Sequence, residues 1–313
     1  EDPFYRAIKQ FQPFGKVLDL NQDQENFNIN QDRNVKTDKV EGKLDYYFIL
    51  SPKANINLTF GVTDVRQDFD SSIFQILDNN SILDFNENNL FNRVNFHFQD
   101  AYSALHYRFI KGIFTFDPGV TFHYYKTSTD QLNLITSDAY SFIRPDFRVL
   151  MKLKESETLR LIFRSTRQFT DINNLAEGFI FRNYNSFFRG NSNLEAAFFN
   201  VVNLNYQSIN IFNFTNIFAN LSYSRRDNAI QNTTAVQGIN SVRSATNSDF
   251  PRYTYTASGR IDKRFKNFKG GLNVNFNYSD FNNVINNNPT ESINFNQRYS
   301  ANIATNFRNM PNL

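Results

Sequence analysis

Apolar and polar residues alternate one by one along most of this chain. In the segment GLNVNFNYSD (271–280), Leu272, Val274, Phe276 and Tyr278 share one parity, and most residues between them are asparagine. Successive side chains of an extended strand point to opposite faces, whereas a helix would place apolar residues three and four positions apart. The segment therefore predicts a strand with one apolar face and one amide-rich face.

The same period of two recurs in about eleven segments after residue 40, each about 11–14 residues long. In one of them, Val94, Phe96 and Phe98 are assigned to the apolar face and His97 to the polar face. The segment 213–224 is the exception, because aromatic residues occur on both parities there; a β-bulge or a protein-covered outer face would explain it. The other segments with this pattern are 44–50, 56–62, 120–124, 147–153, 159–163, 202–206, 253–261 and 299–307.

The connections between these segments are alternately short and long. Short connections predict tight turns, and the long ones are rich in Asn, Asp, Ser and Thr, which is typical of surface loops. The short connections are 51–54, 110–112, 154–157, 209–212 and 266–270, and the long ones are roughly 66–91, 127–143, 168–197, 226–252 and 281–297.

The length of the predicted strands indicates a membrane environment. A strand of about twelve residues is ~40 Å long, and a tilt of ~40° makes it span ~30 Å, the thickness of the hydrocarbon core of a bilayer. Strands of soluble β-sandwiches are usually only ~5–6 residues long. Because strand edges must be paired inside a membrane, the sheet must close. We therefore expect an antiparallel transmembrane β-barrel of the bacterial outer membrane, with short periplasmic turns and long extracellular loops.

Composition agrees with this interpretation and excludes several other classes. Aromatic residues make up 16% of the chain, and they gather near the ends of the predicted strands, where barrels carry aromatic girdles. A net charge of +3 predicts no nucleic-acid partner. The absence of cysteine rules out disulfides and thiolate metal sites. Residues 1–10 show no signal-peptide pattern, and no apolar run is long enough for a membrane-spanning helix.

Nothing in the sequence predicts catalysis, a metal site or a cofactor. None of the sequence signatures of a nucleophile elbow, a phosphate-binding loop or a zinc-binding helix occurs. The segment 78–89 resembles a calcium loop, but Leu83 replaces the glycine needed at the sixth position, so an ordinary loop is favoured. His97, His106 and His123 are the three histidines. A metal pair formed by His97 and His123 is conceivable, and solvated or hydrogen-bonded histidines are favoured.

The segment 186–230 resembles the barrel part of TonB-dependent-receptor-like proteins of the Bacteroidota. In that family a Gly-Asn-x-x-Leu-Glu element leads from a long external loop into a descending strand, and here it reads GNSNLE at 190–195. The segments 116–125 and 143–163 are similar to this family as well, and the resemblance extends over roughly residues 40–313. It implies an outer-membrane barrel of about 22 strands that encloses a plug domain and takes up a nutrient with energy from an inner-membrane coupling complex.

About eleven strands are half of the number that the resemblance implies, and neither a plug nor an energy-coupling box is visible. We therefore interpret the chain as a fragment of a larger barrel, with a leading segment (1–40) that is a first strand or a loop, and barrel strands over 41–313. Energised uptake is the expected function. The alternatives are a non-transporting barrel that serves as an accessory of an outer-membrane complex, with a surface lipoprotein or another subunit as partner, and a passive porin.

Two groups of residues are candidates for ligand binding. Arg148, Arg160, Arg164 and Arg260 all lie on the polar parity of their strands and are expected to face the lumen. They would either pair with acidic residues of the plug or form a path for anionic ligands. In a long loop, Tyr184, Phe187 and Phe188 are candidates for contacting a sugar or a peptide.

Overall fold

The computed structural model describes residues 4–5, 18–21, 23–25, 27–85, 90–183, 186–237, 240–305 and 307. Its dominant feature is a set of eleven long strands that confirms the predicted strand number. These strands are β2 (Asn28–Ser51), β3 (Ala54–Ile76), β5 (Phe91–Lys111), β6 (Phe114–Gln131), β7 (Leu134–Lys154), β8 (Glu157–Gln168), β11 (Ala197–Asn210), β12 (Thr215–Asp227), β15 (Arg252–Phe265), β16 (Phe268–Ile285) and β17 (Asn288–Thr305).

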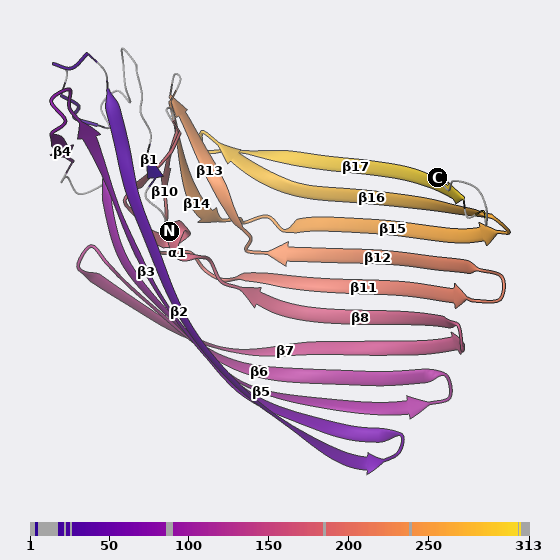
Figure 1. Ribbon diagram of the computed structural model, residues 1–313. Coiled ribbons are helices and arrows are strands. Elements are labelled where there is room, and N and C mark those ends of the chain that lie inside the picture. The colour runs from indigo at the N-terminus through magenta and orange to yellow at the C-terminus, as the bar shows by residue number, and fades with distance from the viewer. Residues whose placement is uncertain are drawn as a thin grey trace.

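The eleven strands form one curved antiparallel sheet in the order β2-β3-β5-β6-β7-β8-β11-β12-β15-β16-β17 (Figure 1). Among the described residues, β17 pairs only with β16, and β2 pairs with β3 and, over two residues, with β1 (Phe4–Tyr5). The sheet is therefore an open arc of a larger barrel. Its two edge strands, β2 and β17, run in the same direction, because nine strands separate them. No helix in the described part of the chain is long and apolar enough to cross a membrane.

The first barrel strand begins earlier than the assigned boundary at residue 40. Strand β2 starts at Asn28 and is paired with β3 from there onward. Residues 28–40 of the leading segment thus belong to β2. The short connections all occur where the sequence predicts them, and they lie along one rim of the arc.

Two of the predicted long loops are wrong. In place of a loop over 127–143, β6 and β7 continue to a two-residue turn at Leu132 and Asn133. In place of a loop over 281–297, β16 and β17 continue to a turn at Asn286 and Asn287. All four turn residues have positive φ, which suits the tight hairpin turns whose twist matches that of the strands. Polar composition suggested loops, although polar residues also form strands where both faces meet water.

The other long connections carry small elements that fold together. They contain β4 (Ile82–Asp84), α1 (Ile172–Leu175), β9 (Phe179–Asn183), β10 (Ser186–Arg189), β13 (Ile230–Gln237) and β14 (Asn240–Asn247). Strand β10 pairs in parallel with β14, and β13 pairs in parallel with β16. We call α1, β9, β10, β13 and β14 the loop layer; it lies at the rim opposite the short turns (Figure 1).

The outer face of the arc is apolar near the short turns. Leu44, Phe60, Val62 and Phe122 belong to this face and leave between 45% and 67% of their surface exposed. Leu272 and Phe276 on β16 share it, because they lie opposite Ile261 and Ala257 of β15. Large exposed apolar side chains in a continuous band are expected where the surrounding medium is lipid rather than water. The predicted lipid-facing parity is therefore confirmed for these strands.

Farther from the short turns, the apolar parity changes sides. Val94 and Phe96 of β5 are buried on the inner face, where Phe98 packs against the same cluster. The register of β3 with β5 has no shift, so His97 lies on the outer face. The predicted assignment of these residues to lipid and lumen is thus wrong. At this level the outer face meets water, so the apolar residues lie on the inner face and pack against the loop layer, as in the core of a water-soluble β-protein.

The irregular segment 213–224 does not contain a bulge. The pairing of β11 with β12 is continuous from Thr215 to Asp227. Phe214 lies in the turn before the strand, and Phe218 belongs to the inner face, where it lies opposite Gln207 and Arg260. One inward-facing phenylalanine and the turn therefore account for the mixed parity.

Candidate functional site: the inner wall

Polar side chains cross the inner wall in rows that run from strand to strand. In one row, each residue lies directly opposite the next on the neighbouring strand, and the members are Arg160, Asn205, Asn220, Ser258, Asn275 and Arg298. Asn220 Nδ2 donates a hydrogen bond to Asn205 Oδ1 over 2.6 Å. A hollow of about 350 Å³ opens beside this row, and Arg160 and Arg260 contribute to its lining. The wall therefore offers amide, hydroxyl and guanidinium groups to the inner space.

The four candidate arginines all lie on the inner parity, but their partners differ. Arg260 Nε is 2.6 Å from Asp262 Oδ2, and Arg148 Nη1 is 3.9 Å from Asp117 Oδ2. Among the described residues, Arg160 and Arg164 have no carboxylate within 4.0 Å. Aspartates of the wall thus form ion pairs with two of the four arginines, whereas Arg160 and Arg164 form none, although Asp146 lies directly opposite Arg164.

Each histidine contacts an aspartate on another strand. His123 Nδ1 is 2.9 Å from Asp100 Oδ1, and His106 Nε2 is 3.1 Å from Asp146 Oδ2, both on the inner face. The hydrogen-bonded interpretation of the histidines is therefore confirmed. The described residues contain no group of three or more His, Cys, Asp or Glu that could hold a metal ion.

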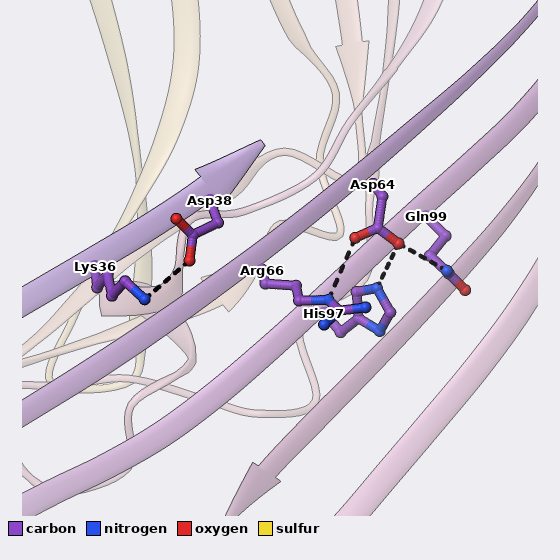
Figure 2. Close-up of polar contacts among 6 residues, drawn as sticks. All are labelled: Lys36, Asp38, Asp64, Arg66, His97 and Gln99. Atoms are coloured by element: carbon purple, nitrogen blue, oxygen red, sulfur yellow. Dashed lines mark hydrogen bonds and ion pairs between the residues drawn. The ribbon is translucent and has the colours of Figure 1, made fainter. Parts of the chain in front are cut away.

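His97 belongs to a polar cluster on the outer face, just beyond the apolar band (Figure 2). Asp64 Oδ2 accepts hydrogen bonds from His97 Nε2 over 2.7 Å and from Gln99 Nε2 over 2.8 Å, and Arg66 Nε is 3.4 Å from Asp64 Oδ1. The hydrogen bond from His97, and then that from Gln99, hold the pKa of Asp64 below its ordinary value. The step from Val62 to Asp64 along β3 marks the external edge of the lipid-facing surface.

The loop candidates do not form an exposed site. Tyr184 lies outside the described residues. Phe187 and Phe188 are 2% and 3% exposed, and each belongs to a buried cluster. Phe187 packs with Ile29 and Ile73 of the wall, and Phe188 packs in the cluster that also contains Val94. These rings join the loop layer to the barrel wall, so they are not available at the surface for a ligand.

Other arginines of the inner wall are not among the four candidates, and two of them face each other. Arg226 and Arg252 lie at the external ends of β12 and β15, directly opposite each other. Both arginines fall within the connection of 226–252 that the sequence predicts as a loop, and a loop carries no strand parity. The parity of the preceding strand residues, extended by two positions, would have placed Arg226 on the inner face.

Comparison with solved structures shows the same fold in outer-membrane receptors. The chain is similar to the copper transporter OprC (TM-score 0.59, 12% identity, 80% of this chain and 39% of that chain). It is also similar to the hemophore receptor HasR of Serratia marcescens (TM-score 0.60, 11% identity, 89% and 50%) and to the alcaligin outer membrane receptor FauA from Bordetella pertussis (TM-score 0.53, 13% identity, 88% and 44%). The chain thus spans half or less of the length of these structures.

These likenesses establish the fold of the arc as part of a barrel like those of these outer-membrane receptors and transporters. No curated protein matches the chain. The model of the outer membrane protein beta-barrel family matches residues 11–312. Because this match includes nearly every residue, the chain is an outer-membrane protein and belongs to the outer membrane protein beta-barrel family.

Proposed function

We propose that this arc is part of the barrel of an active importer, which takes up a nutrient with energy delivered through a plug domain from an inner-membrane coupling complex. The observation that carries the proposal is the polar inner wall beneath a folded loop layer. A structural scaffold needs an apolar outer face, but it does not need amide and guanidinium rows on the inside. Such rows are suited to a hydrated ligand or to a polar plug. The origin in the Bacteroidota stays a prediction.

The loop layer supports import over passive diffusion. Ile172 and Leu175 of α1, Ile180 of β9 and Phe188 of β10 are buried against Phe69 and other inner-face residues of the wall. This packing holds the loop layer inward, over part of the external opening. An importer that captures scarce ligands needs such a binding surface, whereas a porin needs an unobstructed channel.

The observation that favoured an accessory role with a protein neighbour in the membrane has another explanation. The mixed parity of 213–224 suggested a covered outer face, and the inward position of Phe218 accounts for that pattern without a neighbour. A surface lipoprotein partner remains compatible with the importer, because the outer rim and the loop layer are both accessible from outside the cell.

The test is a comparison of strains that carry the full-length parent gene, a deletion of it, or a version without any coupling box that the parent encodes. Each strain is grown in a defined medium, and depletion of the medium components is followed by mass spectrometry. We expect at least one component whose depletion requires both the gene and the coupling box. Depletion that requires the gene but survives a protonophore would indicate a porin. Unchanged depletion, together with co-purifying outer-membrane subunits, would indicate an accessory role.

A further inference from the structure

Two arginines face each other at the external end of the inner wall. Arg226 of β12 lies directly opposite Arg252 of β15, and Phe199 of β11 lies directly opposite Arg226 on the other side. Residues directly opposite each other on antiparallel strands have Cβ atoms about 4.5–5.5 Å apart. The two arginine side chains therefore start from neighbouring positions on the same face of the sheet.

A phenylalanine flanks each arginine of the pair. Arg226 Cζ is 4.9 Å from the centre of the Phe199 ring, and Arg252 Cζ is 4.7 Å from the centre of the Phe281 ring. A guanidinium over an aromatic face is held by attraction to the ring and by stacking. The rings thus fix the orientation of both guanidinium groups without using their N–H donors, which remain free for an acceptor.

No carboxylate of the described chain neutralises this pair. Neither arginine has an ion-pair partner within 4.0 Å, whereas the adjacent Arg225 contacts Asp227 over 2.7 Å on the other face of β12. Burial, and then the positive charge of Arg252, lower the pKa of Arg226. The Nε atom of Arg226 is also buried without a hydrogen-bond acceptor. Like charges opposite each other destabilise a sheet, and a bound anion would remove that cost.

The pair lies where a ligand would enter. On the outer face, Tyr223, Tyr255 and Tyr278 mark the external end of the apolar band, and Arg226 lies beyond Tyr223 toward the external rim. On the inner face, Arg164 is the next candidate arginine toward the short turns, since it lies opposite Val201, which lies opposite Ser224. An anion released from the pair would meet the guanidinium of Arg164 there, which has no ion pair within 4.0 Å although Asp146 lies directly opposite it.

We propose that Arg226 and Arg252 together bind one oxyanion, a carboxylate or phosphoryl group carried by the incoming ligand. Two guanidinium groups side by side can donate several N–H bonds to the oxygens of one such group. The inference deepens the proposed import function, on which it rests, by naming a chemical class of ligand. Binding is measured without transport, so the two proposals can fail separately. The same chemistry could be supplied by a carboxylate elsewhere in the parent protein, and the test distinguishes the two sources.

The experiment is isothermal titration of the full-length parent protein in nanodiscs at low ionic strength, with sodium phosphate and sodium acetate as probes. We expect saturable binding of at least one probe by the wild type, and affinity at least ~10-fold lower in Arg226→Gln and in Arg252→Gln. Arg252→Lys keeps the charge but loses the planar fork of donors, so its affinity should lie between that of the wild type and that of Arg252→Gln. Arg225→Gln is the matched control, because Arg225 is adjacent in sequence and lies on the outer face, and its affinity should equal that of the wild type.

Two results would overturn the inference. Equal affinity in the wild type and in Arg252→Gln would place any anion site elsewhere. No binding by the wild type would exclude an open site, and a lowered thermal midpoint of Arg252→Gln would then assign the pair to an acidic residue of the parent protein itself. The heat-dependent electrophoretic mobility of each variant verifies that its barrel has folded, so a folding failure cannot be mistaken for a loss of binding.

Discussion

His106 on β5 reaches past β6 to Asp146 on β7, with 3.1 Å between His106 Nε2 and Asp146 Oδ2. The residue between them is Gly119, which lies opposite His106 on one side and opposite Asp146 on the other. A Cβ atom at position 119 would overlap the His106 ring. Contact across three strands therefore depends on the absence of a side chain in the middle strand.

The first prediction concerns this glycine. Gly119→Ala should displace the His106 ring, break its contact with Asp146 and lower the free energy of unfolding by about 1 kcal/mol, the net contribution of one hydrogen bond. Urea titration of the protein refolded in lipid vesicles measures the change. Gly259→Ala is the matched control, because a Cβ atom there meets nothing within 4 Å. Equal effects of the two substitutions would show that the histidine contact is irrelevant to stability.

The second prediction concerns the two faces of β16. Val274 lies on the apolar parity and Asn275 on the polar parity of the same strand. Val274→Arg should make folding into a bilayer less favourable by about 2–4 kcal/mol, because the arginine would be placed in lipid near mid-depth. Asn275→Arg should cost no more than about 1 kcal/mol, because it points into the hydrated interior and its main penalty is the like charge of Arg298 directly opposite. Vesicle refolding curves for both variants test this, and a larger loss for Asn275→Arg would reverse our assignment of the faces.

The third prediction concerns the change of apolar parity along β3. Phe69 is fully buried against the loop layer, whereas Phe60 is 53% exposed on the outer face. Phe69→Ala should cost about 3–5 kcal/mol, because it leaves a cavity in a packed cluster. It should also speed tryptic cleavage after Arg182 and Arg189, which are exposed residues of the loop layer. Phe60→Ala is the control and should leave the cleavage rate unchanged; faster cleavage in both variants would contradict the assignment.

The fourth prediction concerns pH. The pKa of Asp64 is lowered from 3.8 by hydrogen bonds from His97 and Gln99, so the folded state favours the ionised carboxylate. The stabilisation is therefore fully present above pH 3.8 and is lost as the pH falls through the lower, folded-state pKa. The difference in unfolding free energy between the wild type and Asp64→Asn should shrink as the pH falls from about 5 toward 3. A difference that does not change with pH would mean that Asp64 contributes nothing through its charge.

The parts of the fold that follow from local alternation could be predicted from the sequence. In the membrane-facing part, lipid outside and water or polar protein inside impose one parity rule on every strand. That rule located the eleven strands, the short turns and the inner positions of Arg148, Arg160, Arg164 and Arg260. These features require only that neighbouring side chains point to opposite faces.

The remaining features depend on contacts between distant segments, which alternation does not encode. Val94 and Phe96 have the same pattern as a lipid-facing strand, and only the loop layer, contributed by residues about eighty positions later, makes their face the buried one. Phe188 looked like an exposed loop residue for the same reason. The pairing of Arg226 with Arg252 depends on the register of β12 with β15. A long polar connection separates these strands in the sequence, and alternation does not predict the register across it.

The common direction of β2 and β17 restricts how the circle can be completed. A single extra strand, or any odd number of them, can join both borders with antiparallel bonding throughout. An even number would force a parallel seam, and two identical arcs related by rotation about the barrel axis would force two of them, one at each junction of β17 with β2. A symmetric pair of these chains is therefore a poor way to complete the ring. The geometry favours a second arc that differs in sequence and contains an odd number of strands.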